Sequence, residues 1–187
     1  MSLLIFFVFG LGLYDNSYAE DFSIYELKAK LVDKDNKEIG FDTYKGSPVL
    51  ISMFYGSCPH ICPALIRNIR SIEKQLGKKA KKRVKVLLIS FDPERDTPKA
   101  LKALAKKHYV DDKSNWNFAS GESDAVREIA AVMGIKYRKL DNGEFNHTSK
   151  IVVLDSKGRN KFEIDGVKSA SKDDIKELES LLANPKF

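Results

Sequence analysis

Two strongly apolar runs constrain the fold of this 187-residue chain more than any other feature. The runs are Val49–Phe54 and Val84–Ser90, and each has the length of a β-strand. Strands that are apolar at successive positions are buried on both faces, as happens in sheets that helices cover. A helical pattern follows each run, so the sequence predicts an α/β sandwich with a central sheet and helices on both faces.

The helices are predicted from apolar periodicity and from capping residues. Spacings of four, four, three and four residues give the first helix an apolar stripe. Thr97 and Pro98 suit the N-cap and the first position of a second helix. Gly134 would stop a third helix over Ser123–Met133, and Ser171 would cap the last. The stripe of the first helix consists of Ile61, Leu65, Ile69, Ile72 and Leu76.

The remaining segments give weaker signals. Alternation from Tyr25 to Leu31 predicts an extra amino-terminal strand, with a second extended piece over Glu38–Tyr44. The basic run Lys78–Arg83 is expected to form a solvated turn. Further strands are expected at Trp116–Phe118, Tyr137–Leu140, Phe145–Leu154 and Lys161–Ile164, with a hairpin turn at Asp141-Asn142-Gly143.

Composition excludes some classes of protein. The chain is 43% hydrophobic and 31% charged, which is a globular balance and is enough for one domain. The formal net charge is +6, which would favour an acidic partner or an anionic membrane surface. The basic residues form no stripe interleaved with aromatic residues, so we expect no nucleic-acid partner.

The amino terminus predicts export. Leu3–Leu13 is apolar but too short to span a membrane, and Ser17 and Ala19 have the spacing that a signal peptidase requires. We therefore interpret residues 1–19 as a cleaved export signal, or the remnant of a membrane anchor, and residues 20–187 as a single domain. The mature protein is expected in the periplasm or at the outer face of the inner membrane, where cysteines meet oxidising conditions.

Cys58 and Cys62 are the two cysteines of the chain, and they lie where an apolar strand ends and a helix begins. They could form a structural disulfide, a dithiol redox couple or two ligands of one metal. A loop this short constrains the unfolded chain little, which disfavours a structural disulfide. The amino end of a helix should make both thiols more acidic, and acidic thiols are good metal ligands and good disulfide exchangers.

Two thiolates favour Cu(I) or zinc, but structural zinc takes four protein ligands, and the chain has three histidines and no third cysteine. His108 follows two lysines and is predicted to be an inert surface residue. His60 lies between the cysteines, either as an exposed loop residue or as an auxiliary ligand or proton donor. His147 stands at the entry to a strand, where position alone does not identify a ligand.

Three ordered motifs resemble the SCO/SenC family of copper-binding, thioredoxin-like proteins. The segment Cys58-Pro59-His60-Ile61-Cys62-Pro63 is similar to the CPxxCP metal loop of the family. Asp92–Pro98 is similar to its DPxRDTP segment, which we interpret as a structural loop. Asn146-His147, with Leu154-Asp155 and Gly158 after it, is similar to its histidine strand.

The resemblance implies a thioredoxin-like sandwich with a central mixed sheet, extra amino-terminal strands and a hairpin before the histidine strand. It implies that Cys58, Cys62 and His147 bind copper, as Cu(I) or Cu(II). The function it implies is that of a copper chaperone for the dinuclear copper site of cytochrome c oxidase subunit II. The implied partners are that subunit or another copper protein, an upstream copper donor protein and a membrane.

The alternative is a periplasmic thiol-disulfide oxidoreductase that reduces the copper-ligand cysteines of its client. Cys58 and Cys62 would then be its catalytic residues, and enzymatic activity stays open at this point. A peroxide-handling enzyme is disfavoured, because no threonine and arginine arrangement of a peroxidase surrounds Cys58.

Two positions depart from the family. His60 stands where members commonly carry an acidic residue, and Asn146 where they commonly carry aspartate. Both departures leave the three expected ligands intact, and the second removes a charge that could tune His147.

Overall fold

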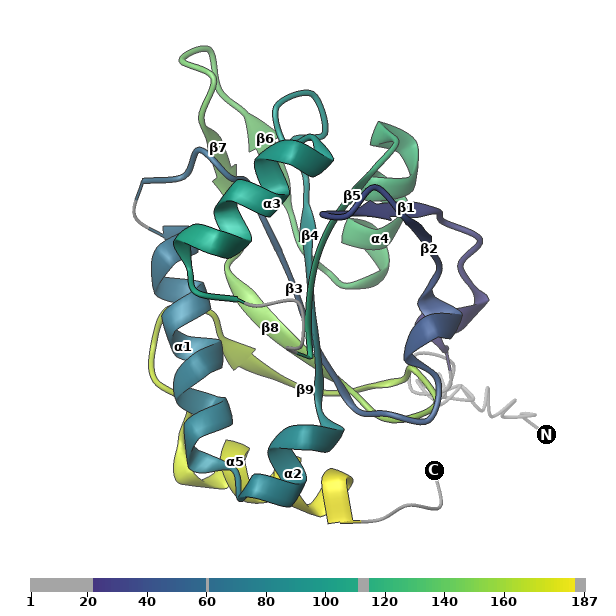
Figure 1. Cartoon of the computed structure of the whole chain (residues 1–187), viewed down its shortest axis with the longest axis vertical. Helices are drawn as coiled ribbons and strands as arrows, with labels where there is room; N and C mark the ends of the chain where they lie inside the picture. Colours follow the sequence, from purple (N-terminus) through teal and green to yellow (C-terminus); the bar gives the residue numbers. More distant parts are fainter. Residues whose placement is uncertain (1–21, 60, 111–114, 184–187) are drawn as a thin grey trace, which may run out of the picture.

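A seven-stranded mixed sheet runs through the middle of the molecule, with strand order β2-β1-β5-β4-β3-β8-β9 (Figure 1). The computed structural model describes residues 22–59, 61–110 and 115–183. The strands are β1 (Leu31–Asp33), β2 (Glu38–Ile39), β3 (Val49–Phe54), β4 (Lys85–Ser90), β5 (Trp116–Gly121), β6 (Tyr137–Lys139), β7 (Phe145–His147), β8 (Lys150–Leu154) and β9 (Asn160–Asp165). The helices are α1 (Ile61–Gln75), α2 (Lys78–Arg83), α3 (Pro98–Lys107), α4 (Ser123–Val132) and α5 (Lys172–Ala183), with 3-10 helices η2 (Ile24–Glu26) and η3 (Phe41–Tyr44).

The two apolar runs form neighbouring parallel strands at the centre of this sheet. All six residues of β3 are buried, and β4 pairs with it in parallel from Val49 opposite Lys85 to Phe54 opposite Ser90. β5 continues the parallel sheet beside β4, whereas β8 pairs with β3 in the antiparallel direction. The predicted α/β sandwich with a central mixed sheet is therefore confirmed.

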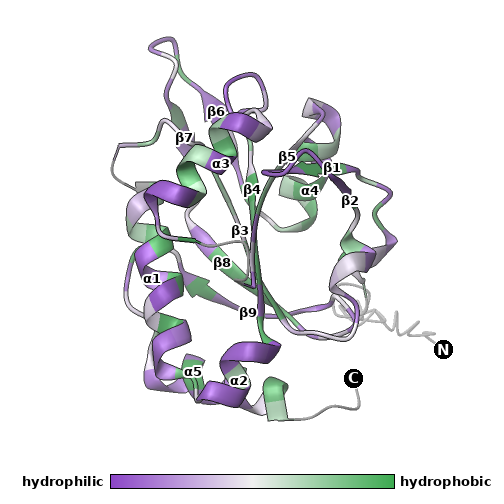
Figure 2. Ribbon diagram, in the orientation of Figure 1, coloured by the Kyte–Doolittle hydropathy of each residue, from purple (hydrophilic) through white to green (hydrophobic). Residues whose placement is uncertain are grey.

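The helices cover both faces of the sheet, as Figure 1 shows. α1 joins β3 to β4, and α3 joins β4 to β5. Both connections are right-handed and move along the sheet in the same direction, so both helices lie on the same face. α4 lies on the opposite face. Figure 2 shows the hydrophobic residues gathered in the central strands, while the outer sides of the helices are hydrophilic.

The helix ends match their predicted signals. The Thr97 side chain accepts a hydrogen bond from the Ala100 N–H at 3.4 Å, and Pro98 occupies the first turn of α3. At the start of α5, the Asp174 N–H donates to the Ser171 hydroxyl at 3.1 Å, and the Ser171 N–H donates to the Asp174 carboxylate at 2.7 Å. Gly134 follows α4 with a φ of +60°, a conformation that glycine adopts readily.

The amino-terminal prediction is wrong in part. Ser23 and Glu26 form a capping box, in which the side chain of each accepts a hydrogen bond from the backbone N–H of the other. This motif starts the 3-10 helix η2 where a strand was predicted. The strand begins only at Leu31. The second extended piece is limited to β2, because Phe41–Tyr44 turns into η3.

The basic run Lys78–Arg83 is a helix rather than a turn, although its charged side chains are solvated as expected. Three basic residues lie in its last turn, where the helix dipole favours positive charge. Figure 2 shows α2 as a largely hydrophilic helix at one end of the molecule.

The predicted strand Phe145–Leu154 is divided into β7 and β8. β7 pairs with β6 in a separate two-stranded antiparallel sheet, which we call the β6–β7 ribbon, and β8 joins the main sheet. Thr148 and Ser149 make the break, since their backbones bond to different partners, Lys136 and Gly166. His147 is consequently the last residue of the ribbon.

Within the described residues, no helix combines the length and the hydrophobicity that crossing a membrane would require. The predicted export signal, residues 1–19, lies outside the described residues.

Candidate metal centre

The two cysteines lie where β3 passes into α1, at the carboxyl ends of the central parallel strands. The Cys58 N–H donates to the Tyr55 carbonyl oxygen at 3.2 Å and closes the turn that follows β3. Cys62 lies in the first turn of α1, and Pro63 follows it where a helix leaves N–H groups unbonded. The helix therefore begins near Cys62, as predicted.

The start of α1 is directed at the first cysteine. The Cys62 N–H donates a hydrogen bond to the Cys58 Sγ atom at 3.3 Å. When the Cys58 thiol ionises, its sulfur carries the negative charge, so this hydrogen bond stabilises the thiolate. Both side chains are buried, with 8% of Cys58 and 4% of Cys62 exposed. Cys58 is thus the slightly more accessible of the two.

His147 reaches the cysteines from the end of β7. Its Nδ1 atom lies 3.1 Å from the carbonyl oxygen of Thr148. A tautomer that donates from Nδ1 to this oxygen leaves the lone pair of Nε2 free for a metal. Histidines that bind a metal are commonly oriented by such a hydrogen bond from their other ring nitrogen.

The structure brings the three predicted ligands into one cluster. One ligand atom each from Cys58, Cys62 and His147 lies within 4.8 Å of the other two. Donor atoms about 2.3 Å from one ion lie up to about 4.6 Å from one another, so the cluster is close to the size of a single site. No further cysteine, histidine or carboxylate of the described residues belongs to this group. Two sulfurs and one nitrogen suit a soft ion such as Cu(I) better than structural zinc.

Of the other two histidines, His108 is described and is not part of the cluster. His108 caps the carboxyl end of α3, and its carbonyl oxygen accepts a hydrogen bond from the Arg70 guanidinium. Burial lowers the pKa of His108, and nearby positive charges act in the same direction. His60 lies outside the described residues.

The expectation that both thiols are more acidic than free cysteine is wrong for Cys62. Burial raises the pKa of the Cys62 thiol, and this effect outweighs the opposing backbone hydrogen bond with Tyr55. Cys62 is therefore a protonated thiol at neutral pH in the metal-free protein. A metal ion that binds it must displace the proton.

Aromatic rings enclose the histidine side of the cluster. The ring centroid of His147 lies 5.0 Å from that of Phe91 and 5.9 Å from that of Tyr55. Phe145 and Tyr137 extend the group, at 5.1 and 4.9 Å from Phe91. The rings restrict how the imidazole can turn and give the cluster an apolar surrounding, in which a bound ion would meet little water.

The loop after β4 supports the cysteine turn, through a contact that the sequence did not predict. Asp96 is buried, and its Oδ2 atom accepts hydrogen bonds from the Gly56 N–H at 2.7 Å and from the Ser90 hydroxyl. A β-carbon on Gly56 would collide with this carboxylate, so a larger residue there would have to displace the Asp96 side chain. Burial raises the pKa of Asp96, although both hydrogen bonds oppose the shift.

The same loop holds the β6–β7 ribbon. Arg95 forms an ion pair with Asp92 and donates to the Gly143 carbonyl oxygen at 2.6 Å, and its guanidinium lies 5.8 Å from the ring centroid of Phe145. We call Asp92–Asp96 the bridge, because it contacts both the turn before Cys58 and the ribbon that carries His147. The structural role predicted for the DPxRDTP-like segment is confirmed and is more extensive than local capping.

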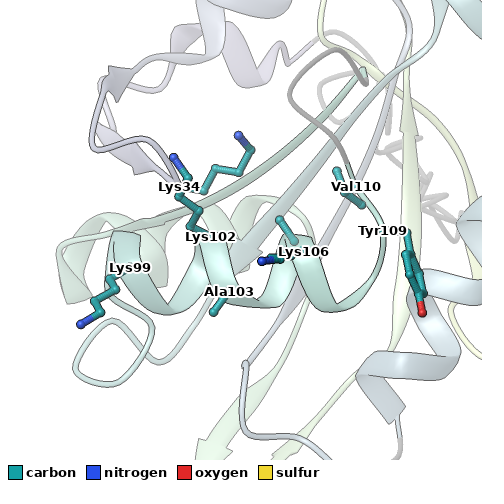
Figure 3. A pocket seen from close by; sticks show the side chains of 8 residues that line it. Lys34, Lys99, Lys102, Ala103, Lys106, Tyr109 and Val110 are labelled. Carbon is teal, nitrogen blue, oxygen red and sulfur yellow. The ribbon is translucent and has the colours of Figure 1, made fainter.

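A surface hollow of about 720 Å³ lies away from the cluster, against α3 (Figure 3). Lys34, Lys99, Lys102, Ala103, Ala105, Lys106, Tyr109 and Val110 line it. It contains no soft metal ligand among these residues. This hollow and the cysteines therefore lie in different places, and of the two, among the described residues, the Cys/His cluster is the one with soft metal ligands.

Comparison with known proteins agrees with the motifs. The sequence matches the SCO1/SenC family over residues 21–183. It is 30% identical to the SCO1 protein homolog of Bacillus subtilis over 146 residues, which cover 76% of this chain and 75% of the relative.

Solved structures share the fold. The structure of Bradyrhizobium japonicum ScoI with copper bound superposes with a TM-score of 0.69 at 25% identity, covering 82% of this chain and 96% of that one. BsSco, a member of the Sco family of cytochrome c oxidase assembly proteins with a disulfide switch, superposes with a TM-score of 0.71 at 26% identity. In that comparison 85% of this chain and 94% of the other are covered.

Proposed function

Because the chain belongs to the SCO1/SenC family, we propose that it is a copper chaperone that delivers copper to the dinuclear site of cytochrome c oxidase subunit II. The observation that carries this proposal is the cluster of Cys58, Cys62 and His147 donor atoms within 4.8 Å of one another. Copper is the metal that this donor set and the copper-bound relative support.

Copper is the cargo in this proposal, and the site must both hold it and release it. Two thiolates and one imidazole would hold Cu(I), with the proton of Cys62 displaced on binding. Three-coordinate Cu(I) leaves room for an incoming thiolate of the acceptor protein. Handover then proceeds by exchange, in which an acceptor sulfur binds as His147 leaves and a second one replaces one cysteine. The other cysteine then dissociates, and the freed thiolates take up protons from solvent.

Competition titration with a Cu(I) chelator tests the ligand set. We expect one Cu(I) per reduced chain, and a loss of at least about tenfold in affinity, or ~1.4 kcal/mol, for His147→Ala. Cys58→Ser and Cys62→Ser should lose more, because a hydroxyl is a poor ligand for Cu(I). His108→Ala is the matched control and should bind like the wild type. Full affinity of His147→Ala would refute the three-ligand site.

A second candidate function is thiol-disulfide oxidoreduction, favoured by the hydrogen bond from the Cys62 N–H to the Cys58 Sγ atom. The Cys58 thiolate would attack a disulfide of the client and form a mixed disulfide with one client sulfur, releasing the other as a thiolate. Cys62 would lose its proton and attack Cys58, which frees the reduced client and leaves a Cys58–Cys62 disulfide. An upstream dithiol protein would then have to reduce this disulfide.

The two functions separate experimentally. Reaction of Cys62→Ser with an oxidised dicysteine peptide should trap the mixed disulfide if the protein acts as a reductant. Retention of Cu(I) in the presence of a competing chelator, without reaction toward the peptide, supports the chaperone.

We also propose that residues 1–19 direct export and are then removed. The support is the apolar run and the small residues Ser17 and Ala19. Amino-terminal sequencing of the mature protein should begin near Glu20. An intact amino terminus on the mature protein would instead favour an anchor.

A further inference from the structure

We propose that the outward face of the β6–β7 ribbon is a docking surface for an acidic segment of the protein that receives copper. This proposal rests on the proposed copper-transfer function. The outer ribbon face, as we name it, consists of Lys136, Arg138, Asn146 and Thr148.

The strand register separates this face from the metal cluster. In the ribbon Tyr137 pairs with His147, and Arg138 pairs with Asn146. Because successive side chains of a strand point to opposite sides, Tyr137 and His147 face the aromatic group, whereas Arg138 and Asn146 face solvent.

The outer ribbon face is hollowed and held by the backbone. A hollow of about 270 Å³ is lined by its four residues together with Tyr137 and His147. The Thr148 N–H donates to the Lys136 carbonyl oxygen at 2.8 Å, and the Lys136 N–H donates to the Thr148 hydroxyl at 3.4 Å. The face therefore exists before any partner binds.

Its positive charge is not compensated within the described residues. Neighbouring lysines are paired, Lys139 with Glu94 at 2.8 Å and Lys150 with Glu163 at 2.6 Å. Lys136 and Arg138 are exposed and have no such partner in the part of the chain that the structure describes.

The residues around this pair do not neutralise it. Asn146, directly opposite Arg138, is a neutral amide where an aspartate would have formed a cross-strand ion pair. Glu144, two residues before Asn146 and just ahead of β7, forms no ion pair with a described residue. The lining of the hollow contains no carboxylate.

The location of this charge fits copper transfer. His147 borders the hollow while its ring reaches the cluster, so a partner on the outer ribbon face lies beside the nitrogen ligand. Acceptor cysteines react as thiolates, which are anions, and acidic neighbours would add to their attraction. Uncompensated cations at this position would speed the approach and orient the acceptor toward the ligand that leaves first.

A charge-neutralised double variant tests the proposal. The probe is a synthetic peptide with a Cys-x-x-x-Cys segment between aspartates and glutamates, and its counterpart has lysines in their place. Lys136→Gln with Arg138→Gln should slow transfer of Cu(I) to the acidic peptide roughly 3–10-fold at low salt, and the difference should vanish at high salt. The Cu(I) affinity of the variant should equal that of the wild type.

The matched control is Lys161→Gln with Lys172→Gln. Both lysines are exposed and lie on β9 and α5, and their replacement removes the same charge. Transfer from the control should keep the wild-type rate. Equal rates and equal salt dependence for the two double variants would overturn the proposal.

Binding without copper separates this proposal from the proposed function. The acidic peptide with serines in place of cysteines should bind the metal-free wild type, as measured by fluorescence anisotropy, and should bind the Lys136/Arg138 variant several-fold more weakly. Such binding in a protein that fails to hold Cu(I) would refute the chaperone and support the surface. Normal copper binding with no preference for the acidic peptide would refute the surface alone. If the wild type binds phosphatidylglycerol vesicles more tightly than the peptide, and the Lys136/Arg138 variant does not, the outer ribbon face binds a membrane and the proposed docking of a protein is overturned.

Discussion

Asp96→Ala is the most informative single substitution in this fold, because the carboxylate joins two elements that carry the site. Its Oδ2 atom accepts hydrogen bonds from the Gly56 N–H and the Ser90 hydroxyl, and the side chain is buried. Replacement by alanine removes this acceptor from both the Gly56 N–H and the buried Ser90 hydroxyl.

The expected loss of stability follows from the donors that lose this acceptor. An unsatisfied buried donor costs about 1–3 kcal/mol, and removing a buried carboxylate offsets part of any larger loss. We therefore expect about 2 kcal/mol, which lowers the melting temperature by ~4–8 °C in a domain of this size. Asp96→Asn keeps an oxygen acceptor in place and should lose less than about 1 kcal/mol.

Thermal unfolding of the metal-free protein at pH 7, followed by circular dichroism, measures this effect. Asp173→Ala is the control, because Asp173 is exposed and lies 3.9 Å from Lys176 in a solvated pair that should contribute little. Cu(I) affinity should fall with Asp96→Ala, since the turn that precedes Cys58 loses its anchor. A melting temperature within 2 °C of the wild type, or equal losses for Asp96→Ala and Asp96→Asn, would show that the hydrogen bond does not act as argued.

Three other predictions concern the bridge, acid stability and proton release. Arg95→Gln removes the hydrogen bond to the Gly143 carbonyl oxygen, which leaves the Lys139–Glu94 ion pair as the remaining polar link that we describe between the ribbon and the bridge. This substitution should weaken Cu(I) binding in the competition titration, and unchanged affinity would contradict its positioning role. Hydrogen bonds from Lys34 and Lys102 lower the pKa of Asp35 to about 2, so its contribution to stability is present above pH ~4 and is lost as the pH falls toward 2. Asp35→Asn should accordingly lower the melting temperature at pH 7 but not at pH 2, and an equal effect at both values would rule out the ionised pair as its source. Because burial raises the pKa of Cys62, Cu(I) affinity should rise by about tenfold per pH unit between pH 6 and 8, and a flat profile would mean that no proton is displaced.

The central architecture could be predicted from the sequence because local patterns and tertiary burial agree there. The apolar runs became β3 and β4, and the stripe from Ile61 to Leu76 became α1. Prediction failed where a short hydrogen-bonded motif outweighed periodicity. The capping box at Ser23 produced a 3-10 helix in an alternating segment, and six successive basic or small residues formed α2 where a turn was expected.

The candidate site was predictable only in part. The position of Cys58 and Cys62 at a strand–helix switch follows from local sequence. The approach of His147, 85 residues after Cys62, depends on the pairing of β6 with β7, and only the family resemblance indicated it. The contact between Asp96 and Gly56 had no local signal, because it joins loops that follow two different strands.

The break between β7 and β8 has a consequence for how such a site could evolve. The sulfur ligands lie in the turn and helix that directly follow β3, one of the buried central strands, whereas the nitrogen ligand lies on a two-stranded element that shares no strand with the main sheet. Mutations at the exposed positions of the ribbon, such as Arg138 and Asn146, can therefore adjust the reach and tilt of the imidazole without altering a strand of the main sheet. Natural variation in metal affinity should consequently be concentrated in the ribbon, while the strands beneath the cysteines tolerate little change.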